Sequence, residues 1–239
     1  MSNARRAFTL VELLVVISII GLLSTIAIVS MGNSRDKARI ASGQSFDQSI
    51  HQKLGDRLEG EWLLNAISGG ATPDSSGNGR SGTVTNATVV AGIYDNAFSL
   101  SGSGYVDVGP LDISNAITVS AWIKPTVSGK NGFIVGKLPV NTQWELFLEG
   151  GYIRWRAGAP ESNATSCPEP TMNNWHHVVG TQYGGQAAIY IDGKQCVTAT
   201  ITPIADGNNN VQIGTFAGSY NFTGIIDQVR VYSGSLLEP

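Results

Sequence analysis

Charged residues are scarce in this 239-residue chain, at 14% of the sequence, against about 25% in an ordinary globular protein. Only two cysteines are present, which excludes a small scaffold held together by disulfides. The pI of about 5.6 provides no basic surface, so nucleic-acid binding has no support. A hydrophobic content of 42% and a net charge of only −3 argue against intrinsic disorder.

The scarcity of charge is greatest in residues 13–34, which carry none. A helix of about 20 apolar residues crosses a bilayer core, so this run is long enough to span a membrane. Arg5 and Arg6 precede it, which favours a cytoplasmic N-terminus. Basic residues also follow it, namely Arg35, Lys37 and Arg39. The charges alone therefore leave the orientation open.

Two features separate this run from an ordinary secretory signal peptide. It exceeds the usual apolar core of about 7–15 residues, and no small-residue cleavage site ends its helical pattern. It also opens with a lone carboxylate, Glu12, and an ionisable group in a membrane span usually has a partner. A free α-amino group on Phe8, in this chain or in a neighbouring one, would be such a partner if the chain were cut before Phe8.

The segment from Arg5 to Val16 reads Arg-Arg-Ala-Phe-Thr-Leu-Val-Glu-Leu-Leu-Val-Val. It resembles the class III signal of type IV prepilins and type II secretion pseudopilins. The resemblance implies that a prepilin peptidase cuts between Ala7 and Phe8 on the cytoplasmic side, and that Phe8 is then N-methylated. It also implies that Glu12 neutralises the amine of an adjacent subunit as the helix leaves the membrane for a filament. The family usually has glycine where this chain has Ala7, and a plain membrane anchor is the alternative interpretation.

An amphipathic pattern predicts that the helix continues beyond the apolar run. Its apolar residues recur at every fourth position: Phe46, Ile50, Leu54 and Leu58. This spacing places them on one helix face. We therefore expect a helix over 8–58, apolar over about 8–31, that docks this face on the following domain; a loose amphipathic linker is the alternative. Glycine costs about 1 kcal/mol relative to alanine inside a helix, so we expect a break or bend at one of Gly32, Gly43 and Gly55.

After Glu61 the sequence changes to short β-branched or aromatic segments separated by Gly, Asn, Asp and Pro. Alternation over Ile117–Lys124 and a final run over Gly224–Tyr232 predict strands, and Asp192-Gly193 is a strong two-residue hairpin signal. About a dozen such strands favour an antiparallel sandwich or jelly roll. The fold class is therefore α+β: a leader over 1–7, a long N-terminal α-helix, and an antiparallel β-sandwich over 60–239.

Six phrases stand in a consistent order in this second part: Asp74–Gly79, Ala97–Val108, Ile117–Pro125, Asn174–Gly180, Ile189–Gly193 and Phe222–Tyr232. Together they resemble the laminin-G-like domains of the concanavalin A-like lectin/glucanase jelly rolls. The resemblance covers about residues 60–239. It implies a two-sheet sandwich that binds carbohydrate, protein or matrix.

Some proteins with this fold hydrolyse glycans, and those enzymes need paired carboxylates on one strand face. Glu145 and Glu149 lie four apart on one predicted strand, but the Asp that the glucanase pattern places between them is missing, and Phe147 stands midway. We therefore interpret both glutamates as solvent-facing residues and the protein as non-enzymatic.

The best candidate for a metal site is the loop that opens the second part. Asp74, Ser76 and Asn78, closed by Gly79, place oxygen atoms at alternate positions of a tight turn, which suits a structural Ca²⁺; a metal-free Asx turn is the alternative. The loop is not an EF-hand, since no Glu stands at its twelfth position. In many laminin-G-like domains the corresponding loop binds calcium with the Asp of the last strand, and the resemblance implies Asp227 for this role.

Export to an oxidising compartment predicts a disulfide between Cys167 and Cys196, which bracket neighbouring strands. His176 and His177 are adjacent on a predicted strand, so they point to opposite faces and cannot share a metal ion; we assign them structural roles. Aromatic residues in or beside loop-like stretches are candidates for a ligand-binding rim: Tyr183, Phe216, Tyr220 and Phe222.

These observations predict a bacterial protein that inserts in the inner membrane, is processed by a prepilin peptidase and assembles into a helical surface filament. The first part would build the filament, and the second would display a surface that binds a carbohydrate or a surface protein. Two alternatives are a minor pseudopilin of a type II secretion system, in which the jelly roll binds the next subunit, and a surface-tethered glycan-active enzyme.

Overall fold

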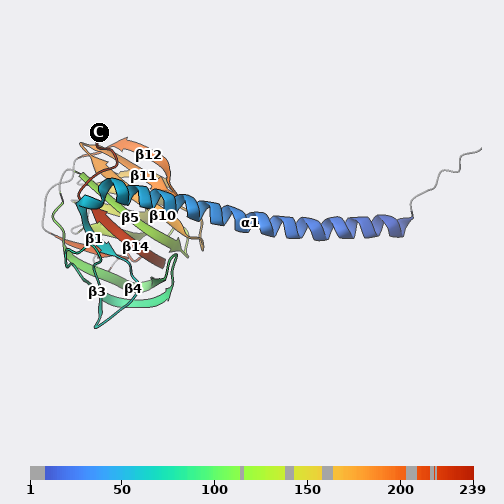
Figure 1. Ribbon diagram of the computed structural model, residues 1–239, viewed down its shortest axis with the longest axis horizontal. Helices are drawn as coiled ribbons and strands as arrows, with labels where there is room; N and C mark the ends of the chain where they lie inside the picture. Colours follow the sequence, from blue (N-terminus) through green and yellow to red (C-terminus); the bar gives the residue numbers. More distant parts are fainter. Residues whose placement is uncertain are drawn as a thin grey trace, which may run out of the picture. The chain divides into compact units, whose positions relative to one another are not determined.

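Figure 1 shows a computed structural model of the chain, which describes residues 9–113, 116–137, 143–157, 164–202, 209–215, 218 and 220–239. Side chains are described for all of these except 26–33. The chain divides into two compact units, Met1–Arg39 and Ile40–Pro239. The boundary falls inside the long helix, so the last part of that helix belongs to the β-rich unit.

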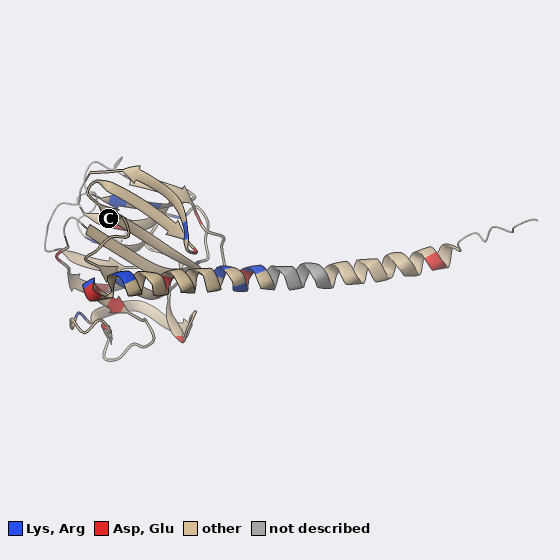
Figure 2. Cartoon of the chain, turned by 45° about the horizontal axis from the view of Figure 1, so that its top comes forward, with Lys and Arg blue, Asp and Glu red and all other residues tan. Residues whose placement is uncertain are grey.

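The helix α1 extends over Leu10–Leu54. It passes through Gly32 and Gly43, and the expected break occurs at Gly55, where the 3₁₀ turn η1 (Gly55–Arg57) ends it. The helix therefore stops four residues before the predicted end at Leu58, which instead begins the first strand. In Figure 2, one acidic residue is coloured at the start of α1, and further charged residues are coloured in the part of the helix beside the strands.

Strands make up the rest of the described chain. They are β1 (Leu58–Trp62), β2 (Ala71–Thr72), β3 (Gly82–Ala91), β4 (Asn96–Pro110), β5 (Ala116–Pro125), β6 (Gly132–Lys137), β7 (Trp144–Glu149), β8 (Tyr152–Ala157), β9 (Ala164–Pro168), β10 (His176–Tyr183), β11 (Gln186–Ile191), β12 (Lys194–Thr200), β13 (Asn210–Ile213) and β14 (Gly224–Tyr232). The predicted last strand is confirmed at both ends. The hairpin turn between β11 and β12 is also confirmed, with positive φ at Asp192 (52°) and Gly193 (78°), as a two-residue turn of this kind requires.

The strands pair antiparallel in the order β12-β11-β10-β5-β14-β4-β13-β6-β7-β8-β9, with β1 beside β14 and β3 beside β4. Alternate residues of these strands enclose one large apolar core, in which Trp62, Trp144 and Trp155 are fully buried. The predicted antiparallel β-sandwich is thus confirmed. A disulfide between Cys167 on β9 and Cys196 on β12 joins the two ends of the strand order.

Strand β5 is buried on both faces, although its alternation predicted only one buried face. Ile117, Val119, Ala121 and Ile123 belong to the large core, as predicted. The opposite face, which includes Trp122, is buried as well. Residues 40–54 of α1 contact this second face, as Figure 1 shows for the helix over β5, β10 and β14. The predicted docking of the helix stripe is confirmed, since Ile50 and Leu54 form a second apolar cluster with Val179 and Tyr232.

Candidate functional site

The start of α1 is closed by a reciprocal pair of hydrogen bonds between Thr9 and Glu12. The Thr9 backbone N–H and hydroxyl each donate to Glu12 Oε2 at 2.8 Å, and the Glu12 N–H donates to Thr9 Oγ1 at 3.2 Å. This is a capping box, in which a Thr and a Glu three residues later satisfy exposed N–H groups of the first turn. The Thr-x-x-Glu spacing is visible in the sequence, so Glu12 has a local role at the helix start besides the one that the prepilin resemblance implies.

The predicted cleavage site, Ala7 and Phe8, lies outside the described residues. The helix surface after the cap is strongly apolar: side chains from Leu10 to Leu23 are exposed, with Leu10 at 77% and Leu22 at 65%. Within the part of the chain that the structure describes, no helix is both long and apolar enough to cross a membrane.

Gly43 allows the helix to approach the sheet closely. A Cβ atom at this position would lie 2.7 Å from Cη2 of Trp122 and 2.9 Å from the Cβ of His177. Trp122 and His177 are paired across β5 and β10 and are both fully buried. Next to this contact, Ser42 donates its hydroxyl to the Asp192 carbonyl oxygen at 2.9 Å. Gly43 is therefore a packing residue of the junction between helix and sheet.

A buried ion-pair network forms one turn further along the helix. Asp47 is 3% exposed, and its Oδ2 accepts a hydrogen bond from Arg230 at 2.6 Å, while Arg230 also donates to Glu61 at 2.6 Å. His177 Nε2 lies 3.4 Å from the Asp47 Oδ1 atom. Burial would raise the pKa of Asp47, but the contact with His177 and the charge of Arg230 outweigh it and hold the pKa well below its usual value. The helix, β1, β10 and β14 are thus tied together by charge as well as by apolar packing.

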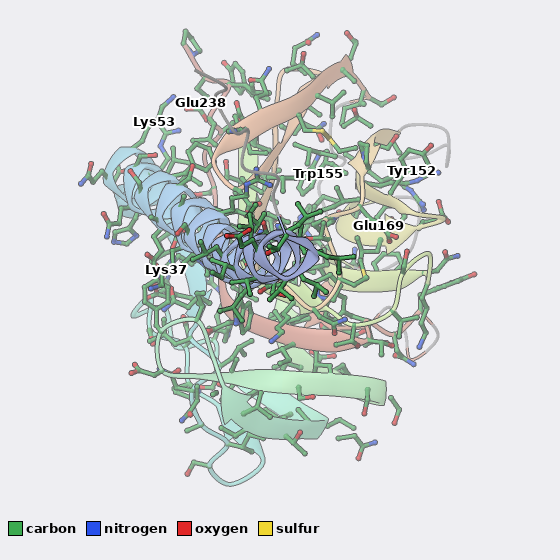
Figure 3. All side chains as sticks on the ribbon, turned by 90° about the vertical axis from the view of Figure 1, so that its right-hand side faces the viewer. Lys37, Lys53, Tyr152, Trp155, Glu169 and Glu238 are labelled. Atoms are coloured by element: carbon green, nitrogen blue, oxygen red, sulfur yellow. A yellow bond between two sulfur atoms is a disulfide. The ribbon has the colours of Figure 1, made fainter. Side chains whose placement is uncertain are left out.

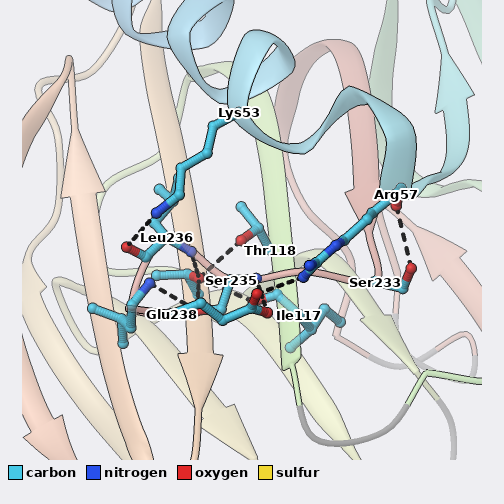
Figure 4. A network of polar contacts seen from close by, with 10 residues as sticks. Lys53, Arg57, Ile117, Thr118, Ser233, Ser235, Leu236 and Glu238 are labelled. Atoms are coloured by element: carbon cyan, nitrogen blue, oxygen red, sulfur yellow. Dashed lines mark hydrogen bonds and ion pairs between the residues drawn. The ribbon is translucent and has the colours of Figure 1, made fainter.

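The C-terminal tail, residues 233–239, contacts the end of α1 and the turn η1 through hydrogen bonds and an ion pair (Figure 4). Lys53 donates to the Leu236 carbonyl at 3.4 Å, Arg57 forms an ion pair with Glu238, and the Ser233 N–H donates to the Arg57 carbonyl at 2.9 Å. The tail is itself anchored, because the Ser235 hydroxyl is hydrogen-bonded to the buried Thr181 at 2.8 Å. The helix residues 40–54 are therefore an integral part of the β-rich unit.

The outer face of β6, β7 and β8 carries a row of charged and aromatic side chains. Glu145 pairs with Arg156 at 3.2 Å, and the Arg156 guanidinium lies 4.5 Å from the centre of the Phe147 ring. Phe147 in turn stacks on Phe133 at 5.0 Å. The prediction of a solvent-facing Glu145 is wrong, since Glu145 is fully buried. Alternation along β7 placed it correctly on the outer face but gave no information about its Arg156 partner on the next strand.

The same outer face also carries residues that are at least partly exposed to solvent, Glu149 on β7 and Tyr152 on β8. Glu149 is partly exposed and pairs with Arg154 at 3.2 Å, beside Tyr152, which is 45% exposed. In Figure 3, Tyr152 lies at the periphery while Trp155, on the same strand, points into the sandwich. Both candidate catalytic carboxylates thus have arginine partners, and neither is placed as a general acid or base.

Of the four predicted rim residues, two are at the surface. Tyr220 is 48% exposed and Tyr183 is 39% exposed, and the Tyr220 ring lies 6.1 Å from Phe133. Phe222 is a correction, because it is fully buried in the large core. Its backbone N–H donates to the Gly214 carbonyl at 2.9 Å, a contact that a position beside a predicted loop does not indicate. Phe216 lies outside the described residues.

The Asp74 loop is held by its own backbone. Asp74 Oδ1 accepts the N–H groups of Glu61 and Ser76 at 3.0 and 2.9 Å, and its Oδ2 accepts that of Arg80 at 2.9 Å. Burial would raise the pKa of Asp74, but these hydrogen bonds lower it below the usual value. The contacts are those of an Asx turn, and Asn78 uses its amide to donate to the Leu58 and Glu59 carbonyls.

Asp227 accepts its hydrogen bond from a different loop, through Oδ2 and the Ile93 N–H at 2.8 Å. Burial raises the pKa of Asp227 to about 6, in spite of this hydrogen bond. No cluster of three or more His, Cys, Asp or Glu side chains suited to a metal is found in the described chain. The four predicted ligands therefore do not present one shared set of free oxygens, and calcium binding stays a prediction that these contacts do not favour.

The two histidine rings have separate partners, as expected for structural roles: His176 Nδ1 lies 2.7 Å from Asp192 Oδ2, whereas the His177 ring faces Asp47 at 3.4 Å. The backbone N–H of His177 also donates to Asp192 Oδ1 at 3.0 Å, so both strand residues contact the hairpin turn. The predicted disulfide is formed, with the Cα atoms of Cys167 and Cys196 6.2 Å apart.

The structure is thus an antiparallel sandwich with one outer face covered by residues 40–54 of α1, and with arginine-paired carboxylates and aromatic residues on the other. Residues 100–239 match the family described as the concanavalin A-like lectin/glucanases superfamily, and residues 2–28 match the prokaryotic N-terminal methylation motif. The chain belongs to the concanavalin A-like lectin/glucanase superfamily and carries a type IV pilin N-terminal methylation motif.

Solved structures with this fold come from an enzyme and from toxins. Domain 4 of AbnA, a GH43 extracellular arabinanase from Geobacillus stearothermophilus, in complex with arabinotriose, is 22% identical with a TM-score of 0.61; the match covers 75% of this chain and 94% of that domain. The botulinum neurotoxin serotype D ligand binding domain, in complex with N-acetylneuraminic acid, is 20% identical with a TM-score of 0.59 over 78% of this chain. The chain spans 50% of that toxin domain. At these identities the likeness shows the fold alone.

Proposed function

We propose that this protein is a subunit of a type IV pilus or a pseudopilus-like filament that displays a lectin-like domain for binding glycan or protein. In this proposal the chain resides in the inner membrane, a prepilin peptidase cuts between Ala7 and Phe8, and the methylated helix then enters the filament at the cell surface. The observation that carries the proposal is the continuity of α1. One helix begins within the methylation motif, at Leu10, and ends inside the lectin-like domain, where Gly43 and Asp47 contact the sheet.

Binding without catalysis is the favoured activity of the displayed domain. Glu145 and Glu149 are the only carboxylates that the sequence offered as a catalytic pair, and ion pairs to Arg156 and Arg154 occupy them. The arabinotriose and N-acetylneuraminic acid complexes of the two similar domains support a glycan as the ligand class for this fold.

The filament role is tested by expressing the full chain together with a prepilin peptidase. Mass spectrometry of the purified protein is expected to show that residues 1–7 are removed and that Phe8 is methylated. Cells of the native assembly system should then release the protein when surface filaments are sheared. An intact Met1 in the mature protein would refute the proposal.

Glu12→Gln separates the two roles of Glu12. Glutamine also completes a capping box with Thr9, so the helix start is preserved, but the negative charge is lost. We expect this variant to be cleaved normally and to be absent from sheared filaments. Glu12→Ala removes both the cap and the charge and serves as the comparison. Normal assembly of Glu12→Gln would show that only the cap matters.

A further inference from the structure

A polar cavity of about 320 Å³ opens where the helix meets the sheet. Its floor is the buried pair of Asp47 and Arg230, and its walls come from three separate segments: Gln48, His51 and Gln52 of α1, Tyr94 of the β3–β4 loop, and Gln228 of β14. All of these residues belong to the compact unit Ile40–Pro239. A sandwich without the helix would lack this cavity, because four of the lining residues are helical.

The floor of the cavity is rigid and has little net charge of its own. Arg230 donates through Nε to Glu61, through one terminal nitrogen to Asp47 and through the other to Gln228 Oε1, at 2.6, 2.6 and 2.9 Å. One guanidinium thus faces two carboxylates, and Asp47 also faces the His177 ring at 3.4 Å. The charges of the floor are therefore used within the protein, and the single aromatic wall is no cage for a cation. The charge pattern favours a neutral ligand.

The walls supply hydrogen-bonding groups that the protein does not use. The side chains of Gln48, His51 and Gln52 make no hydrogen bond to any described residue, and the Gln228 amide nitrogen has no acceptor there either. Gln228 adopts a positive φ of 45° at a β-bulge between Asp227 and Arg230. Bulges of this kind re-aim a side chain and are common next to binding sites, and the strained backbone holds the amide at the cavity.

Tyr94 gives the cavity an aromatic wall. It is 43% exposed, and its ring meets the buried Trp122 edge-on at 6.4 Å and 89°. The ring therefore has a buried aromatic neighbour and keeps exposed surface that a ligand can contact. Primary amides can donate to and accept from the hydroxyl groups of a sugar. An exposed aromatic ring can stack on the apolar face of the sugar ring. The volume is at the small end of ligand pockets, which run from about 300 to 1,000 Å³.

From this geometry we infer that the junction between helix and sheet is a binding site for one neutral sugar unit, stacked on Tyr94 and hydrogen-bonded by Gln52 and Gln228. The inference rests on the proposed lectin-like function and assigns it to this cavity. It makes the helix a contributor to ligand recognition in addition to its role in the filament.

The test uses the full chain in detergent micelles on an array of neutral, sialylated and uronic-acid glycans, followed by calorimetric titration with the best neutral oligosaccharide. Tyr94→Ala and Gln52→Ala are each expected to weaken binding about tenfold or more, as loss of a central contact does. Ser49→Ala is the matched control, since Ser49 is exposed on the same helix but does not line the cavity. Tyr152→Ala and Tyr220→Ala probe the opposite outer face.

The possible outcomes separate this inference from the proposed function. Loss of neutral-glycan binding in the cavity variants alone supports the cavity as the site. Loss in Tyr152→Ala or Tyr220→Ala alone overturns the cavity but leaves a lectin-like domain. Selective binding of acidic glycans overturns the inference of a neutral ligand. A wild-type chain that binds no glycan overturns both the inference and glycan recognition, whereas the filament role is decided by cleavage and shearing.

Discussion

Replacing Gly43 by alanine should destabilise the protein, although the same change stabilises most helices. In an exposed helix, Gly→Ala contributes about 1 kcal/mol of stability. Here the new methyl group would lie 2.7 Å from the Trp122 ring and 2.9 Å from the His177 Cβ, whereas carbon atoms in favourable contact are about 3.5–4.0 Å apart. Gly43→Ala therefore lowers the stability if helix and sheet are in contact, and raises it if they are not.

The size of the effect follows from the rigidity of the two neighbours. Trp122 and His177 are fully buried, and the His177 Cβ is fixed to the backbone of β10, so neither can move aside freely. Overpacking of this kind costs about 1–3 kcal/mol. After the helix-propensity gain of about 1 kcal/mol is subtracted, we expect a net loss of up to about 2 kcal/mol in the free energy of unfolding. For a domain of this size, such a loss lowers Tm by up to about 8 °C.

The assay is thermal unfolding of the full chain in detergent, followed by circular dichroism. Ser45→Ala is the control, because Ser45 is exposed two residues away on α1 and alanine there should raise Tm slightly or leave it unchanged. If Gly43→Ala raises Tm as much as Ser45→Ala does, the close approach of α1 to Trp122 and His177 is wrong.

Four further predictions concern buried charge, pH, the disulfide and calcium. Asp47→Ala leaves its arginine partner underpaired in a buried site and should lower the free energy of unfolding in urea by about 3–5 kcal/mol. Asp227, with its pKa raised from 3.8 to about 6, binds a proton more tightly when folded, so its contribution to stability falls as pH rises from about 4 to about 6 and is level above that. Urea unfolding of Asp227→Asn should lack this fall. Reduction of Cys167–Cys196 should lower the free energy of unfolding by about 3–4 kcal/mol in the chain-entropy model. The measurement is a lower Tm in the presence of reductant. Calcium in place of EDTA should leave Tm unchanged, since three backbone N–H groups already occupy Asp74.

Each of these predictions has a contrary result. If Asp47→Ala lowers the free energy of unfolding by less than about 1 kcal/mol, water reaches the ion-pair network. If the free energies of unfolding of wild type and Asp227→Asn differ by the same amount at every pH between 4 and 7, the raised pKa of Asp227 is contradicted. An unchanged Tm after complete reduction, checked by mass, would show that the disulfide does not stabilise the fold. A clear rise in Tm with calcium would establish the metal site that the resemblance implied.

The sequence predicted those features that depend on local pattern. The apolar stripe of Phe46, Ile50 and Leu54, the hairpin at Asp192 and the last strand all follow from periodicity and turn chemistry, and all are confirmed. The disulfide was also predictable, since the chain has only two cysteines and the domain was expected to be exported.

Features that depend on partners far away in the sequence were not predictable. The burial of Glu145 depends on Arg156 across the hairpin, and the continuity of α1 through Gly43 depends on Trp122, which is about eighty positions away in the sequence. The cavity at the junction needs three segments brought together from α1, the β3–β4 loop and β14. Single-residue patterns carry no information about such pairings, so helix propensity could not distinguish Gly43 from Gly55 as the place of the break, and strand alternation could not show that Glu145 is buried.

The disulfide has a consequence for crowded assemblies of this protein. A sheet that ends in an open strand exposes unpaired N–H and C=O groups, and such an edge can add a strand from a neighbouring molecule. Here the two terminal strands of the order, β9 and β12, are held with Cys167 and Cys196 only 6.2 Å apart at Cα. An intruding strand would need about 9.6 Å, twice the usual strand spacing. In the proposed filament, where copies would lie side by side, oxidation of one cysteine pair would close this pair of edges to strand addition.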